Sequence, residues 1–115
     1  MINTTNLSND ELKYELIIGL RNEVDRYDAH EKRNRVYERQ YFQQFCDLCF
    51  VYSPKFNYGE NLMNCVQNNN NKNLHDNPNF AHGFESITTG IKNTDNIDDV
   101  KDMISKFNKY KLKTA

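Results

Sequence analysis

The first third of the chain carries a stripe of apolar residues at helical spacing. Its members are Leu12, Leu16, Leu20, Val24 and Tyr27. Intervals of three and four residues place them on one face of an α-helix. Ahead of the stripe, Ser8 and Glu11 match a capping box. Leu7 lies where a hydrophobic staple would pack against Leu12. The pattern predicts a helix that begins at about residue 9.

A second apolar stripe occupies residues 37–52, on nearly the same side of a continuous helix. It consists of Tyr37, Tyr41, Phe45, Leu48 and Tyr52. Residues 28–35 between the stripes are polar, yet they contain two oppositely charged i,i+4 pairs that favour a helix. Two structures fit this pattern: one long helix over about 9–53, or a helix that is kinked or broken near 28–34. We favour the kink or break, because a helix of that length would extend beyond so small a domain. Residues 48–52 are apolar all round, so we expect them to be buried at the centre.

After residue 53 the elements become shorter. The stretch SPKFNYGE at 53–60 is a turn signal, because Pro54 disfavours a helical conformation at the residue before it. Residues 60–66 predict a short helix. The asparagine-rich stretch at 67–79 is of low complexity and predicts a mobile loop.

The last third of the chain predicts two more elements. The first covers residues 80–92, with apolar residues at helical spacing at Phe80, Phe84, Ile87 and Ile91. Pro78 suits the first position of that helix, but Gly83 and Gly90 leave a pair of strands as the alternative. The second is a helix capped by Asp95 or Asn96, with acidic residues in its first turn and lysines at its end, as the helix dipole favours. We expect its buried face to consist of Ile97, Val100, Ile104, Phe107 and Tyr110.

Together these elements predict an all-α fold, a single-domain helical bundle of four or five helices over residues 1–115, with flexible ends at 1–6 and 112–115. A chain of 115 residues is long enough for one domain with its own core. Aromatic residues make up 12% of it. We therefore expect an aromatic core with tyrosine hydroxyls at its edge.

Charge adds two candidate contact surfaces. The net charge of −1 gives no overall attraction for nucleic acid or membrane, so any such affinity requires local patches. The candidate contact residues are Lys32, Arg33, Arg35 and Arg39 in one patch and Lys106, Lys109, Lys111 and Lys113 in the other. No acidic residue follows Asp102 to neutralise the second patch. The alternative is that both patches are the solvated faces of amphipathic helices.

Three cysteines raise the question of a metal. Cys46, Cys49 and Cys65 together with His75 have the donor types of a Cys₃His zinc site. Apolar neighbours surround the first two thiols, and free cysteine is a common small core residue. We therefore favour buried thiols and no cofactor, with zinc as the alternative. The sequence contains no recognisable catalytic motif.

These observations favour a small non-enzymatic interaction protein with a protein partner. Small size and asparagine-rich composition suggest a phage or mobile-element accessory or inhibitor protein that binds a nucleic-acid-handling host machine, such as a defence nuclease complex. Direct binding of RNA or DNA, a zinc-stabilised module and a homodimer are the alternatives. We see no secretion leader and no membrane-spanning run, so we expect a cytoplasmic protein.

Overall fold

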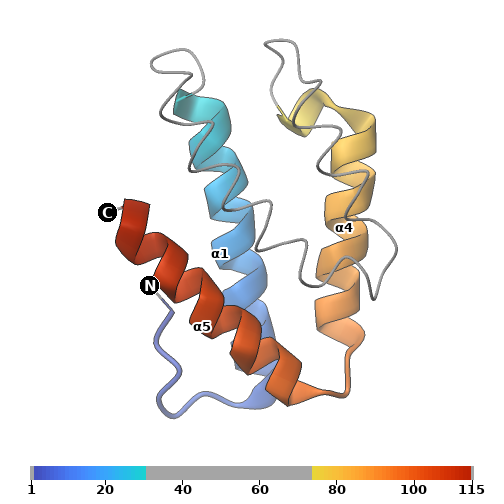
Figure 1. The fold of residues 1–115 in the computed structure, drawn as a ribbon. Coiled ribbons are helices and arrows are strands. Elements are labelled where there is room, and N and C mark those ends of the chain that lie inside the picture. Colours follow the sequence, from blue (N-terminus) through green and yellow to red (C-terminus); the bar gives the residue numbers. More distant parts are fainter. Residues whose placement is uncertain (1, 31–73, 115) are drawn as a thin grey trace.

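The structure, a computed structural model, describes residues 2–30 and 74–114 (Figure 1). Helix α1 spans Asn9–His30, the 3-10 turn η1 spans Leu74–Asp76, α4 spans Pro78–Asn93 and α5 spans Ile97–Thr114. All regular structure within these two ranges is helical, so the all-α prediction is confirmed for them. Residues 28–30 of the predicted break at 28–34 still belong to α1. The rest of that break, the predicted stripe at 37–52, the short helix at 60–66 and the loop up to residue 73 lie outside the described residues.

Helix α1 starts where the sequence predicts. The Glu11 main-chain N–H donates to Ser8 Oγ at 3.2 Å, and the Ser8 N–H donates to Glu11 Oε1 at 3.3 Å. These two bonds form the predicted capping box and satisfy donors that the first helical turn leaves without partners. Leu12, one turn further along, is buried.

Over residues 80–92 the structure decides between the two sequence alternatives in favour of a helix. The Asn77 side chain accepts hydrogen bonds from the N–H groups of Asn79 and Phe80, at 3.1 and 3.2 Å. Pro78 then occupies the first turn, where its missing N–H costs nothing. The glycine at position 83 is buried.

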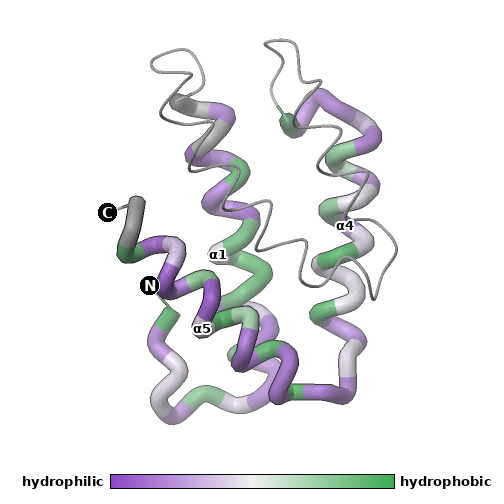
Figure 2. The backbone as a smooth tube through the Cα atoms, viewed as in Figure 1, coloured by the Kyte–Doolittle hydropathy of each residue, from purple (hydrophilic) through white to green (hydrophobic). Residues whose placement is uncertain are grey.

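Helix α1 is the element against which the other two helices pack. Helix α4 runs antiparallel beside α1, and α5 crosses α1 at an angle (Figure 1). Apolar and polar positions alternate along each helix (Figure 2). The core includes the predicted residues Leu12, Leu16, Leu20, Val24, Phe80, Phe84, Ile87, Ile91, Val100, Ile104 and Phe107.

The turn η1 lies in the last part of the stretch that we predicted as a loop. Residues 74–79 form this turn and the beginning of α4, and the Leu74 side chain is 0% exposed. The Asp28 carboxylate of α1 accepts the main-chain N–H groups of Leu74 at 2.7 Å and His75 at 3.2 Å. A side chain 46 residues away in the sequence therefore holds this turn against α1.

Lys13 ties α1 to the end of α4. Its Nζ donates to the carbonyl oxygens of Lys92 at 3.3 Å and Thr94 at 2.7 Å, which belong to the last turn of α4 and its cap. A cation here also suits the negative end of the helix dipole. We expect Lys13→Met to lower the free energy of unfolding by about 1 kcal/mol, measured by urea denaturation.

Lys92→Met is the matched control, because the Lys92 side chain is exposed and only its main chain takes part in this contact. We expect the control to change the free energy of unfolding by no more than about 0.5 kcal/mol. Equal losses in the two variants would show that the contact of Lys13 adds no stability.

Candidate functional site

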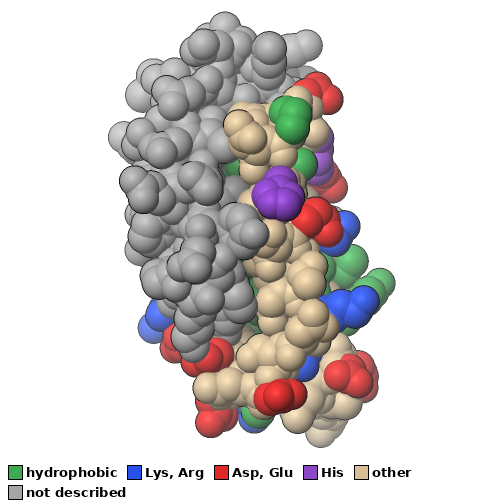
Figure 3. Space-filling view, turned by 90° about the vertical axis from the view of Figure 1, so that its right-hand side faces the viewer, with side chains coloured by type: hydrophobic (Ala, Val, Ile, Leu, Met, Phe, Trp, Pro, Cys, Tyr) green, Lys and Arg blue, Asp and Glu red, His purple; other side chains and the backbone are tan. Residues whose placement is uncertain are grey.

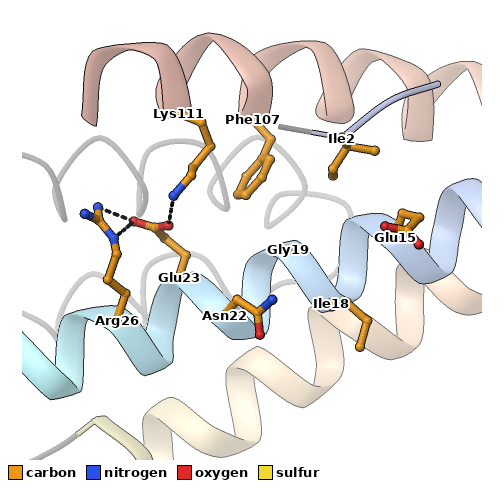
Figure 4. Close-up of a pocket in the computed structure, with 9 residues that line it drawn as sticks. All are labelled: Ile2, Glu15, Ile18, Gly19, Asn22, Glu23, Arg26, Phe107 and Lys111. Carbon is orange, nitrogen blue, oxygen red and sulfur yellow. Dashed lines mark hydrogen bonds and ion pairs between the residues drawn. The ribbon is translucent and has the colours of Figure 1, made fainter. Parts of the chain in front are cut away.

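A buried carboxylate lies where α1 and α5 meet. Glu23 is 4% exposed, and its Oε1 accepts hydrogen bonds from Tyr110 Oη at 2.5 Å and from Arg26 Nη2 at 2.6 Å. Its Oε2 accepts from Lys111 Nζ at 3.0 Å. Figure 4 shows Arg26 and Lys111 reaching Glu23 from the two helices. We call these four side chains the Glu23 cluster.

The cluster changes the proton affinities of its members. Burial by itself raises the pKa of Glu23, but hydrogen bonds from Tyr110, Arg26 and Lys111 outweigh it and place the pKa below its ordinary value. Burial and the adjacent carboxylate raise the pKa of Tyr110. Burial lowers the pKa of Arg26, and the contact with Glu23 more than compensates, so the pKa is raised. Glu23 is therefore ionised and Tyr110 neutral at pH 7.

A groove of about 310 Å³ runs beside the Glu23 cluster between α1, α5 and residue 2. Its walls combine charged and apolar side chains, including Glu15, Arg26, Lys111, Ile2 and Phe107 (Figure 4). This volume is at the lower end of the range for ligand-binding pockets. Apolar surface with fixed charges at its margin is also the composition of a protein-binding surface.

Gly19 lies where the side chains of Phe107 and Ile2 pack closely against α1. A Cβ atom at this position would lie 3.1 Å from Phe107 Cε1 and 3.4 Å from Ile2 Cδ1. From the sequence alone, Gly19 is only a helix defect that costs about 1 kcal/mol relative to alanine. In the structure its missing side chain lets Phe107 and Ile2 approach α1.

The structure changes the interpretation of the second basic patch. Lys106 forms an ion pair with Asp102 at 3.0 Å, and Lys111 belongs to the Glu23 cluster. Lys109 is exposed. Lys113 lies in the last turn of α5, and its side chain is not described. No acidic residue follows Asp102 in the sequence, but Lys106 pairs with Asp102 itself and folding brings Glu23 of α1 to Lys111.

The first basic patch and the candidate zinc site stay untested. Lys32, Arg33, Arg35, Arg39 and the three cysteines lie outside the described residues. His75 alone of the candidate ligands is described, and its Nε2 lies 2.5 Å from Asp25 Oδ1 and 3.6 Å from Asp28 Oδ2. Within residues 2–30 and 74–114, no group of three His, Cys, Asp or Glu side chains is placed to hold a metal ion.

Sequence reasoning missed the Glu23 cluster, although it named two of its members. Tyr110 was expected on the buried face of the last helix and Lys111 in a basic patch. Glu23 follows Leu20 by three residues and precedes Tyr27 by four, so helical spacing places it on the apolar stripe, and this is the sequence signal for a buried carboxylate. Its partners Tyr110 and Lys111 are 87 and 88 residues away in the sequence, beyond the reach of helical periodicity.

The surface of the described residues has no dominant sign of charge. Acidic and basic side chains are interspersed in the view of Figure 3. Over residues 2–30 and 74–114, acidic residues outnumber basic ones. In these two ranges, no helix has the length and apolar character needed to cross a membrane.

Comparison with family models, with curated proteins and with solved structures gives no match for this chain.

Proposed function

We propose that this chain is a small non-enzymatic interaction protein that binds a partner protein through the groove between α1 and α5. The observation that carries the proposal is the groove itself, which places apolar side chains beside charged ones that are already held in position. Arg26 and Lys111 are anchored by Glu23, so little conformational entropy is lost when a partner contacts them. Aromatic and arginine side chains are also common anchors of protein interfaces.

The composition suggests the class of partner. Small size and an asparagine-rich sequence accord with an accessory or inhibitory protein of a phage or mobile element. We propose a nucleic-acid-handling machine of the host as the partner. Direct binding of RNA or DNA receives no support from the described residues, because acidic and basic side chains are interspersed there and steep electrostatic attraction needs a continuous basic surface.

Site-specific photo-crosslinking in the native cells tests the proposal. A photoreactive amino acid at Asn22, which lines the groove and is exposed, should give a discrete protein adduct. The same amino acid at Thr89, an exposed position of α4 outside the groove, is the matched control. We expect the Asn22 adduct to fall at least tenfold when Glu15→Lys reverses a charge at the groove margin, because complementary charge favours the correct partner.

Three outcomes contradict the proposal. No adduct at position 22, or the same adducts at both positions, would show that the groove is not the contact surface. An adduct at position 22 that disappears on nuclease treatment would show nucleic acid as the partner instead.

Glu85→Lys is the control for the charge reversal at Glu15. It reverses a charge at an exposed position of α4 and should leave the adduct at position 22 unchanged.

A further inference from the structure

One side chain of α5 holds the main chain of residue 2 at both of its polar groups. The Ile2 N–H donates to Asn108 Oδ1 at 2.8 Å, and Asn108 Nδ2 donates to the Ile2 carbonyl oxygen at 3.0 Å. A side-chain amide carries one acceptor and two donors, so it pairs with the N–H and C=O of a single residue. Such pairing recognises an extended main chain without reference to its side chains, as strand addition does.

The side chain of Ile2 fills one end of the groove. Ile2 is 9% exposed, and its Cδ1 approaches the position that a Cβ of Gly19 would occupy. Figure 4 shows Ile2 beside Phe107 over this part of α1. The groove continues along α1 from this point to Arg26 and Lys111. The fold thus already contains one example of a non-helical segment seated here.

The attachment of this segment is slight. Residues 3–6 are exposed, and the described contacts with α5 are those of residue 2. One aliphatic side chain and two half-buried hydrogen bonds must offset the ordering of residues 2–6, which lie ahead of Leu7, the next side chain that packs against the core. A segment that makes the same contacts and also fills the groove toward Arg26 would bury more surface and would replace it.

Building on the function proposed above, we propose that the α1–α5 groove receives an extended peptide segment of the partner protein in place of residues 2–3. An aliphatic side chain of that segment takes the position of Ile2 against Gly19 and Phe107. Asn108 pairs with its main chain, and the segment continues along α1 toward Arg26. Residues 2–3 then compete with the partner for one site.

A peptide with the sequence of residues 1–8, MINTTNLS, is a defined probe of this site. Fluorescence anisotropy of the labelled peptide measures its binding to the full chain. We expect Ile2→Gly, which weakens the internal competitor, to bind the peptide at least tenfold more tightly than the wild type. Adding Asn108→Ala to Ile2→Gly should abolish the binding, whereas adding Ser105→Ala at an exposed position of α5 should not.

The result overturns the proposal if Ile2→Gly and the wild type bind the peptide equally, if neither binds, or if Asn108→Ala has no effect. Ile2→Ala replaces Ile2→Gly if circular dichroism shows that the glycine variant is unfolded. The wild type provides a second measurement, because excess peptide should shift the side-chain amide resonances of Asn108 in NMR spectra. Failure to shift them would also count against the site.

The peptide assay tests the occupant of the groove, and the crosslinking experiment tests the partner protein, so a negative result in one does not imply a negative result in the other. Peptide binding without an adduct at position 22 would establish the groove as a peptide site and remove the proposed cellular partner. An adduct at position 22 without peptide binding would keep the interaction protein and reject an occupant that resembles residues 2–3.

Discussion

Glu23→Ala is expected to lower the free energy of unfolding by about 3 kcal/mol, because it leaves cations at a half-buried site without their anion. Arg26 and Lys111 lose a carboxylate at 2.6 and 3.0 Å, and the Tyr110 hydroxyl loses an acceptor. Urea denaturation at pH 7, followed by circular dichroism, measures the loss. A loss below about 1 kcal/mol would mean that the cluster is no more than a surface ion pair.

Glu85→Ala is the control for this experiment. Glu85 forms an ion pair with Arg21 at 3.1 Å, but both side chains are exposed to solvent. Exposed ion pairs contribute about 0–1 kcal/mol. The contrast between the two glutamates therefore isolates the effect of burial and of the additional hydrogen bonds at Glu23.

The contribution of Glu23 should also depend on pH. Its pKa is lowered in the folded protein, so the folded state binds the proton less tightly than the unfolded state does. The difference in unfolding free energy between wild type and Glu23→Gln should be constant above the unfolded-state pKa of about 4.3. It should shrink as the pH falls through the folded-state pKa. A difference that grew in acid would contradict the lowered pKa.

Leu74→Ala is expected to lower the free energy of unfolding by about 3 kcal/mol, as large-to-small changes in a core do. Its side chain is 0% exposed, and Asp28 holds its main chain against α1. If residues 74–79 were a loose loop, as their sequence suggests, the substitution would have little effect. Urea denaturation distinguishes these two cases.

Leu112→Ala is the matched control for Leu74→Ala, because it removes the same atoms from a side chain that is 63% exposed. We expect it to change the free energy of unfolding by no more than about 0.5 kcal/mol. Similar small losses in both variants would show that η1 does not belong to the core.

The polar side chains of the candidate site were largely beyond sequence reasoning. Lys111 was named for its charge, but in the structure it holds Glu23, a residue that helical spacing places on the apolar face of α1. In the sequence, nothing distinguishes Asn108 from the other polar residues, although in the structure it pairs with the main chain of Ile2. These contacts join residues 87 to 106 positions apart. A single sequence carries no signal for such pairs, because hydrogen bonding between distant residues requires no periodicity.

The sequence by itself determined the start of α1 and the apolar faces of the described helices, and it left α4 as one of two alternatives. Ser8 with Glu11 and Asn77 with Pro78 act within one turn of chain, and the apolar stripes follow from the 3.6-residue period of the helix. Tertiary structure alone decided the burial of Leu74, the close packing of Phe107 and Ile2 at Gly19 and the partners of Glu23. Local rules depend on neighbours in sequence, whereas these three features depend on which helices meet and at what angle.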